Sequence, residues 1–199
     1  MRKIDRDSLP HLVNVACRII SRHYFTLLAK IAAWWWGVDL AGNCTFYGRV
    51  RFFRHPRSRI AIGSGCQFRS SPTSNPMGNN RPCILTTLDD GAEIVIGPNC
   101  GFSGTSIVCK EKITLGKNVR CGPNTTIMDT DGHDDDHRSG TNKPVLIEDG
   151  VWLGANVSVY RGVMIGENTF IAASSTVTRS FPGNTFIAGS PARPYKKME

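Results

Sequence analysis

The chain has 199 residues, of which 40% are hydrophobic and 20% are charged, a composition typical of one globular domain with a buried core. Residues 1–60 contain eleven Lys and Arg against three Asp, so they carry the whole net charge of +8, and residues 61–199 are neutral. Because the positive charge is confined to the N-terminal end, a uniformly basic surface for nucleic-acid binding is not indicated.

The first predicted element is an α-helix over residues 8–36, where apolar side chains recur at helical spacing. Pro10 suits the first turn of a helix, and Asp7 or Ser8 just before it can cap the free backbone N–H groups. The apolar part is too short and too interrupted by charge to cross a bilayer. No small-residue cleavage site follows it, so a signal peptide is not expected.

Two roles are open for this N-terminal segment, residues 1–37. The helix can cap the open end of the domain that follows, as a repeat protein requires. It can also lie at a membrane surface, with its arginines against anionic headgroups and Trp34, Trp35 and Trp36 at the interface. We favour the cap, and peripheral membrane contact is compatible with it.

The domain expected over residues 38–187 begins with apolar residues six positions apart. They are Leu40, Phe46, Phe52, then Ile62 and Phe68, then Ile96, Phe102 and Val108, and after one extra residue Leu115, Cys121 and Ile127. The basic run 49–59 is by default a solvated face. Residues 70–82 are rich in Ser, Asn, Pro and Gly and predict an ejected loop, a usual place for substrate contacts on a rigid scaffold.

The clearest pattern covers residues 147–177. Apolar residues recur there at every sixth position, and small or β-branched residues follow four positions after the first five: Ile147, Leu153, Val159, Ile165, Ile171 and Val177, then Val151, Val157, Val163, Thr169 and Ser175. A period of six differs from the 3.6 of a helix and the 2 of a strand, and it is typical of a parallel β-helix. An ordinary meander of buried strands is the weaker alternative.

The corners of this β-helix are expected at four residues of the same stretch. Gly154, Asn156, Gly166 and Asn168 tolerate the left-handed dihedral angles that corners require. Each hexapeptide then forms one side of a coil, and three sides close one triangular turn.

The seven cysteines contain no CxxC pair, and several occupy repeat positions that suit a small apolar side chain: Cys17, Cys44, Cys66, Cys83, Cys100, Cys109 and Cys121. We interpret them as buried free thiols of a protein in a reducing compartment.

A second break in the repeat, residues 128–145, contains the most reactive side chains. Its sequence DTDGHDDDHRSGTN places His133 beside Asp129 and Asp131. Neutral imidazole suits a general base near pH 7, and a nearby carboxylate can orient the ring. A solvated loop histidine is one alternative. A divalent-metal site is another by composition, with Asp134, Asp135, Asp136 and His137 as further ligands, although we expect no metal.

The hexapeptides, the DTDGH motif at 129–133 and the run from PVLIEDGVWLGANVSVYRG to GSPARPYKK resemble the hexapeptide-repeat acyltransferases, especially sugar and polysaccharide O-acetyltransferases. The resemblance covers residues 38–197. It implies an all-β fold, a left-handed parallel β-helix with an N-terminal α-helix and a short basic C-terminal tail at 188–199. It also implies acetyl-CoA as the donor and a homotrimer as the working unit.

The resemblance further implies roles for residues near the acceptor. His133 matches the catalytic base of the family, with Asp129 and Asp131 beside it. Trp152 matches a tryptophan that borders the active site. Relatives that act on simple galactosides have an acceptor-binding Asn near the position of Ser103, so their acceptor specificity does not carry over to this chain.

The resemblance also implies contacts with CoA. Ala155 matches a small residue near the thioester, and with no hydroxyl only its backbone N–H can stabilise a developing oxyanion. Ala173 and Thr178 match residues of the last coils that bind the cofactor. Arg193 and Lys196, just after the GSPA sequence, suit the nucleotide phosphates.

These observations predict an acetyl-CoA-dependent O-acetyltransferase that modifies a sugar hydroxyl in surface polysaccharide biosynthesis. The expected location is the cytoplasm, at the inner face of the membrane if the N-terminal helix contacts lipid. The expected partners are acetyl-CoA and a glycan acceptor, without nucleic acid. N-acetylation of an amino sugar or an antibiotic remains open, as does a β-helix that serves only as a binding scaffold.

Overall fold

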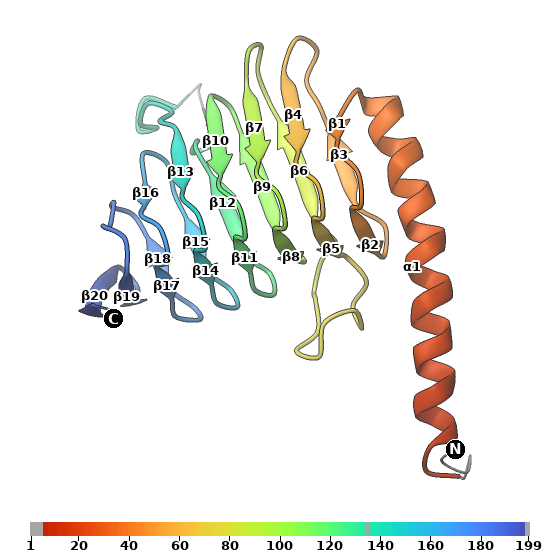
Figure 1. Cartoon of the computed structure of the whole chain (residues 1–199). Coiled ribbons are helices and arrows are strands. Elements are labelled where there is room, and N and C mark those ends of the chain that lie inside the picture. The colour runs from red at the N-terminus through yellow and green to blue at the C-terminus, as the bar shows by residue number, and fades with distance from the viewer. Residues whose placement is uncertain (1–5, 134–135, 198–199) are drawn as a thin grey trace.

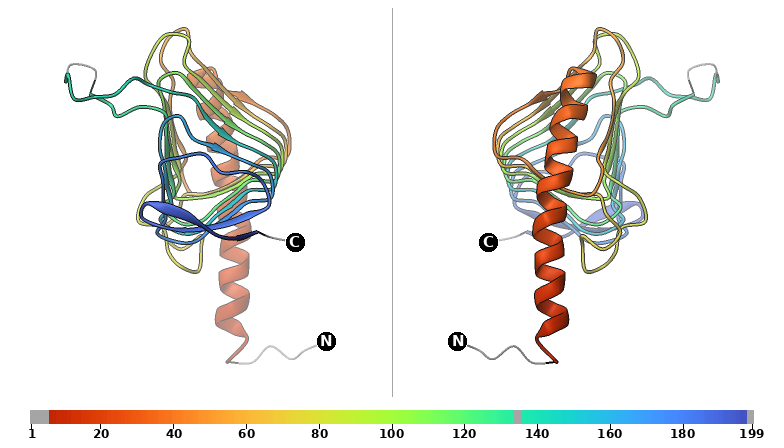
Figure 2. Two further views of the ribbon diagram at one scale, coloured as in Figure 1. Left: turned by 90° about the vertical axis from the view of Figure 1, so that its left-hand side faces the viewer. Right: turned by 90° about the vertical axis from the view of Figure 1, so that its right-hand side faces the viewer.

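The computed structural model describes residues 6–133 and 136–197 and consists of three mainly parallel sheets with one helix at the N-terminal end (Figure 1). From β1 to β19 consecutive strands belong to different sheets, and hydrogen-bonded neighbours are mostly three strands apart in the sequence. Three sides therefore close each turn of a parallel β-helix, whose stacked coils are seen end-on in Figure 2. The predicted mainly parallel architecture with one N-terminal helix is confirmed.

The strands of the three sheets have the following bounds. The first sheet contains β1 (Asp39–Leu40), β4 (Arg59–Ile62), β7 (Glu93–Ile96), β10 (Lys112–Leu115), β13 (Val145–Ile147) and β16 (Met164–Ile165). The second contains β2 (Thr45–Tyr47), β5 (Gln67–Arg69), β8 (Gly101–Ser103), β11 (Arg120–Cys121), β14 (Trp152–Leu153), β17 (Phe170–Ile171), β19 (Thr185–Gly189) and β20 (Ala192–Lys197). The third contains β3 (Arg51–Phe53), β6 (Ile84–Thr87), β9 (Ser106–Cys109), β12 (Thr126–Met128), β15 (Ser158–Val159) and β18 (Thr176–Val177).

The interior of the β-helix is built from the predicted repeat positions. All six from Ile147 to Val177 are buried, as are the small residues that follow them. In the earlier coils Phe46, Phe68 and Phe102 stack with ring centroids 4.9 and 4.8 Å apart. A constant side-chain size at one position thus fills the narrow core from coil to coil.

The prediction of Val108 as an interior residue is wrong. Ile107 is buried instead and lies between Leu85 and Ile127 of the adjacent coils. The corner before it is one residue shorter than the others and contains Gly104 at φ 52°, where an added Cβ would lie 2.8 Å from the carbonyl oxygen of Arg81. The shortened corner therefore shifts the inward position by one residue.

Two different requirements explain the Gly and Asn residues at the corners. Asn156 and Asn168 have φ values of 56° and 54°, as predicted. Gly154 does not have a positive φ, and it is required for space instead, because a Cβ there would lie 2.6 Å from the backbone nitrogen of Ala173 in the next coil. Close approach of stacked backbones is thus what this glycine permits.

The prediction for the cysteines holds for six of the seven. All seven are free thiols, and all are buried except Cys17, which is exposed. Cys17 is the exception because it belongs to the helix and not to the coils.

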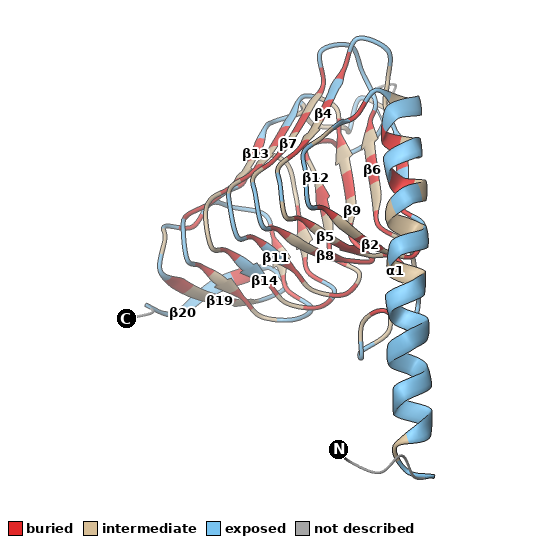
Figure 3. Cartoon of the chain, turned by 45° about the vertical axis from the view of Figure 1, so that its right-hand side comes forward, coloured by how far each residue is buried: buried red, intermediate tan, exposed pale blue. Residues whose placement is uncertain are grey.

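The helix α1 (Leu9–Trp36) runs across the axis of the β-helix and covers its first coil with only part of its length (Figure 1). Ala29 and Ala33 are its buried residues, and the backbone N–H of Phe46 donates to the hydroxyl of Thr26 at 3.1 Å. The N-terminal half extends beyond the coils and is exposed (Figure 3). Within residues 6–133 and 136–197, no helix combines the length and the hydropathy that crossing a bilayer requires.

The last part of the chain, expected as a tail at 188–199, contains a strand. β20 pairs antiparallel with β19, with Lys196 opposite Phe186 and Arg193 opposite Ala188. Residues 198 and 199 lie outside the described residues.

Candidate active site

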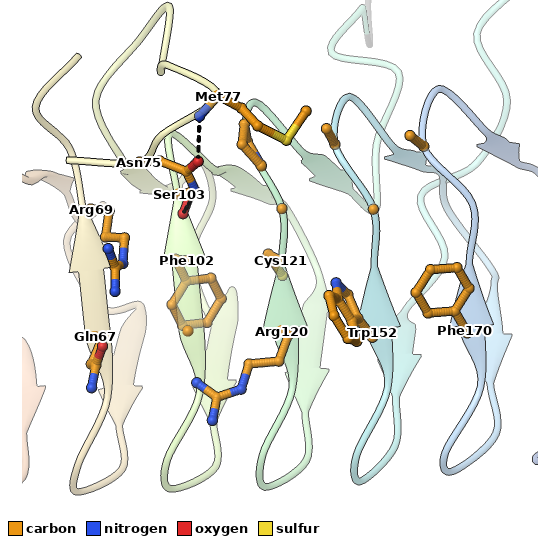
Figure 4. Close-up of a pocket in the computed structure, with 16 residues that line it drawn as sticks. Gln67, Arg69, Asn75, Met77, Phe102, Ser103, Arg120, Cys121, Trp152 and Phe170 are labelled. Carbon is orange, nitrogen blue, oxygen red and sulfur yellow. Dashed lines mark hydrogen bonds between the residues drawn. The ribbon is translucent and has the colours of Figure 1, made fainter. Parts of the chain in front are cut away.

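A cavity of about 640 Å³ lies on the outer face of the second sheet. Its floor comes from β5, β8, β11, β14 and β17 with the corners that follow them, and its wall from the loop 70–82 (Figure 4). The lining residues are Gln67, Arg69, Asn75, Met77, Gly101, Phe102, Ser103, Arg120, Cys121, Gly122, Pro123, Trp152, Gly154, Ala155, Phe170 and Ala173.

The strand pattern places a row of large side chains along this face. Arg120, Trp152 and Phe170 each precede an inward-pointing residue, so they point outward, and they are neighbours in the parallel register. The rings of Trp152 and Phe170 meet edge to face with centroids 5.4 Å apart. Two further rings, Phe186 and Tyr195, continue this aromatic row at 5.3 and 5.5 Å.

The loop 70–82 is held against the cavity by its own polar side chains. The Asn75 amide donates to the Ser103 hydroxyl at 3.0 Å, and the backbone N–H of Met77 donates to Asn75 Oδ1 at 3.0 Å (Figure 4). The amide of the buried Asn79 donates to the carbonyl oxygens of Arg69 and Ser71, both at 3.0 Å. The loop is therefore a fixed wall of the cavity.

The charged groups of the cavity are both positive. Among the described lining residues, only Arg69 and Arg120 carry a charge. Arg69 stacks over the ring of Tyr47 at 5.3 Å and donates to the carbonyl oxygen of Ser74 at 2.8 Å. Arg120 lies over Gly101, where an added Cβ would lie 3.0 Å from its Nη1 atom. Two cations without a lining carboxylate favour a ligand with anionic groups.

His133 does not line the cavity of its own chain. It is exposed on the loop 128–145, which leaves the third sheet after β12 and returns to the first sheet at β13. The loop therefore projects from the corner opposite the second sheet (Figure 2). In a triangular coil this is the corner farthest from the cavity.

The two carboxylates predicted beside His133 bind other groups. The buried Asp129 accepts hydrogen bonds from the backbone N–H of Lys110 at 2.7 Å and of Glu111 at 2.8 Å. Asp131 forms an ion pair with Arg161 and accepts the backbone N–H of Gly140 at 3.2 Å. Both carboxylates therefore fix the base of the loop that carries the histidine.

The cavity brings together four of the predicted site residues and leaves six apart. Ser103, Trp152, Ala155 and Ala173 line it. Outside the lining are His133, Asp129, Asp131, Thr178 at the end of the last coil, and Arg193 and Lys196 on β20.

No group of three or more His, Cys, Asp and Glu side chains in the described parts of the chain is arranged to hold a metal ion. Asp134 and Asp135, named above as possible ligands, lie outside those parts.

Sequence reasoning missed several lining residues. Arg120 and Phe170 occupy the same hexapeptide position as Trp152, so an alignment of the repeats on Trp152 would have found them. Gln67 and Arg69 flank the inward Phe68 in the same way. Asn75 and Met77 lie in the predicted loop 70–82. This loop does not follow the hexapeptide repeat, so the repeat does not indicate which of its residues reach the cavity.

Comparison with known proteins finds similarity to hexapeptide-repeat transferases. Residues 144–179 match the model of the family described as bacterial transferase hexapeptide (six repeats). A galactoside O-acetyltransferase of Lactococcus lactis is 41% identical over 115 residues, which cover 51% of this chain and 55% of the relative. The galactoside O-acetyltransferase of Escherichia coli is 37% identical over 115 residues, which cover 54% of this chain and 56% of the relative. The chain thus spans about half the length of these curated relatives.

Among solved structures, the chain is similar to a variant of AntD, an N-acyltransferase from Bacillus cereus in complex with a dTDP-amino sugar and coenzyme A. The TM-score is 0.61 at 17% identity, over 87% of this chain and 89% of that one, which shows a common fold. Residues 144–179 therefore contain the repeat that the bacterial transferase hexapeptide model describes.

Proposed function

We propose that this chain is an acetyl-CoA-dependent O-acetyltransferase that transfers an acetyl group to a sugar hydroxyl. One observation carries the proposal: Trp152, Ala155 and Ala173, which all belong to the stretch that matches the transferase hexapeptide model, line a single cavity. The relatives named galactoside O-acetyltransferase support the sugar acceptor. The left-handed sense of the β-helix is part of the same proposal.

The proposed reaction is direct transfer. The imidazole of His133 takes the proton of the acceptor hydroxyl while the oxygen attacks the carbonyl carbon of the acetyl thioester. The backbone N–H of Ala155 stabilises the oxyanion that forms. The C–S bond then breaks, and the proton passes from the imidazolium to the sulfur of CoA. The products are an acetyl ester and free CoA thiol, without a covalent enzyme intermediate.

The site requires a neighbouring subunit in this proposal. His133 lies on the corner opposite the cavity of its own chain. In a homotrimer of β-helices with parallel axes, a projecting corner of one subunit faces a side of the next. We place His133 of each subunit in the cavity of its neighbour, with Asp129 and Asp131 as positioning residues that hold the loop.

The cofactor and the acceptor have distinct binding requirements in the cavity. Ala173 and Thr178 border the path of the pantetheine arm, while Arg193 and Lys196 bind the nucleotide phosphates. Arg69 and Arg120 at the other end of the cavity suit an anionic acceptor, and Ser103 offers it a hydroxyl. This arrangement supports a role in the biosynthesis of a charged surface polysaccharide.

The test is thiol release from acetyl-CoA by the wild-type protein and by His133→Ala, with neutral sugars, acidic sugars and sugar nucleotides as acceptors. Loss of the base should lower the rate by about 10²–10⁴-fold and leave CoA binding by calorimetry unchanged. His137→Ala, exposed on the same loop, is the matched control and should keep the wild-type rate.

The same panel decides between the open alternatives. Full activity of His133→Ala would refute the proposed base. Release that needs an amino sugar would assign N-acetylation, and failure to bind CoA would favour the scaffold.

A further inference from the structure

The helix α1 presents an apolar face that no part of the described chain covers. One side of the helix carries apolar residues spaced four or seven positions apart, with exposed fractions between 52 and 69%: Leu9, Val13, Ile20, Leu27 and Ile31. Ala29 and Ala33, on the opposite side, are the residues buried against the first coil. The unpartnered face therefore lies on the side of α1 that is turned away from the β-helix.

This face is broader than the seam of a coiled coil. Leu12, Ile19 and Tyr24 beside it are also exposed. One flank continues into a groove of about 840 Å³ lined by aromatic and aliphatic side chains of α1, with Arg49 at its border. The helix ends in Trp34 and Trp35, with exposed fractions of 78 and 75%. A wide apolar arc that ends in tryptophans suits the boundary between lipid headgroups and acyl chains.

The charges of α1 select among possible partners. The helix contains Arg18, Arg22 and Lys30 and no Asp or Glu. Two copies of α1 packed through the apolar face could form no ion pair between the helices, since neither contains a carboxylate, so the charges give no support to a second copy of α1. An anionic surface complements the same charges. The net charge of +8 lies wholly within residues 1–60, which include α1 and the first coil.

We propose that α1 docks the N-terminal end of the β-helix onto an anionic lipid bilayer. Because α1 runs across the axis of the β-helix, its outer face is the end surface of the molecule (Figure 1). The apolar arc enters the interfacial region, with Lys30 and Arg49 beside it at headgroup level. Arg18 and Arg22 lie on the water side and are attracted by the negative surface potential. The coils then stand away from the membrane.

The experiment is flotation of the full chain with two kinds of vesicle, phosphatidylcholine alone and phosphatidylcholine mixed with phosphatidylglycerol. We expect binding to the mixed vesicles that weakens as salt is raised. The double substitution Ile20→Glu and Leu27→Glu should abolish it, since both side chains are exposed and replacement leaves the core intact. The control Met164→Glu, at a residue of β16 with an exposed fraction of 50%, should bind as the wild type does.

The charge contribution is tested separately. Arg18→Gln with Arg22→Gln should weaken binding roughly tenfold or more. Removal of two distant charges, Lys112→Gln with Lys117→Gln, should change it little.

Three results would overturn the proposal: no flotation with either vesicle, equal binding to both kinds, or equal loss in the Met164→Glu control. A fourth is a smaller oligomer for Ile20→Glu with Leu27→Glu in sedimentation, which would assign the face to a second copy. The His133→Ala variant should float normally, so failure of docking and failure of the proposed catalysis are separate outcomes.

Discussion

Three interior cysteines, Cys66, Cys83 and Cys121, are held as neutral thiols by their surroundings. Burial raises the pKa of Cys83 and Cys121, and a side-chain hydrogen bond with Cys100, together with burial, raises the pKa of the Cys66 thiol to about 11. The thiolate is the reactive form, so these residues are inert near neutral pH.

Cys17 should therefore be the one thiol that reacts readily in the native protein. An alkylating reagent should modify about one thiol per native chain and all seven after denaturation, as counted by mass spectrometry. Cys17→Ser should remove the fast reaction, whereas Cys83→Ser should leave it. Rapid labelling of several thiols in the folded protein would contradict this prediction.

Glu93 makes the folded state sensitive to acid. The Lys112 ammonium at 2.8 Å and then the Arg59 guanidinium at 2.9 Å hold the pKa of Glu93 below its ordinary value of 4.5. A lowered carboxyl pKa stabilises the fold fully above about pH 4.5, and this contribution is lost as pH falls through the folded-state value. The partners are exposed, so the contribution is at most about 1 kcal/mol.

Glu93→Gln should therefore lower the free energy of unfolding by up to about 1 kcal/mol at pH 7, measured by urea denaturation. The difference from the wild type should shrink progressively as pH falls below 4.5. If the difference in free energy of unfolding stays constant down to the pH at which the protein unfolds, the carboxylate charge is not its cause.

At the scale of one element, the coil depends on glycines that let neighbouring backbones approach. Gly154→Ala would place a Cβ 2.6 Å from the backbone nitrogen of Ala173, and backbone atoms cannot move aside cheaply. We expect a loss of about 1–3 kcal/mol in the free energy of unfolding, read from the urea midpoint. Gly42→Ala is the matched control, since its Cβ would meet nothing within 4 Å. Equal effects at both positions would refute the role of close approach.

The regular elements were predictable because every coil places an apolar side chain at the same inward positions. The period of six identified the inward residues from Ile147 to Val177, and it failed at Val108, where the corner is one residue shorter and Gly104 lies close to Arg81 of the loop 70–82. No local signal reports such a contact, because Arg81 and Gly104 are distant in the sequence.

The site was only partly predictable for a related reason. Trp152, Ala155 and Ala173 lie on the regular coils, and all three line the cavity. Asn75 and Met77 reach the cavity through side-chain hydrogen bonds of a loop without a repeat. The distance of His133 from that cavity depends on which corner ejects the loop, which follows from the order of strands in three sheets.

At the scale of the whole molecule, the proposed shared site makes a prediction about mixed oligomers. Ala173→Trp should fill the cavity at an exposed residue and abolish transfer, as His133→Ala should. Co-expression of the two inactive chains in equal amounts should restore about a quarter of the wild-type sites, since histidine and cavity come from different subunits. A site within one subunit predicts no recovery, so thiol release by the mixture distinguishes the two arrangements.

The position of α1 across the first coil has one more consequence. β1, β2 and β3 are the terminal strands of their sheets, and each leaves one row of backbone N–H and C=O groups without a further strand. Such an edge is a template for pairing with another chain, and a β-helix offers three of them at one end. By lying over these strands, α1 obstructs end-to-end polymerisation into fibres. The repeat could in principle continue without limit, and a non-repeating helix is what makes the molecule finite.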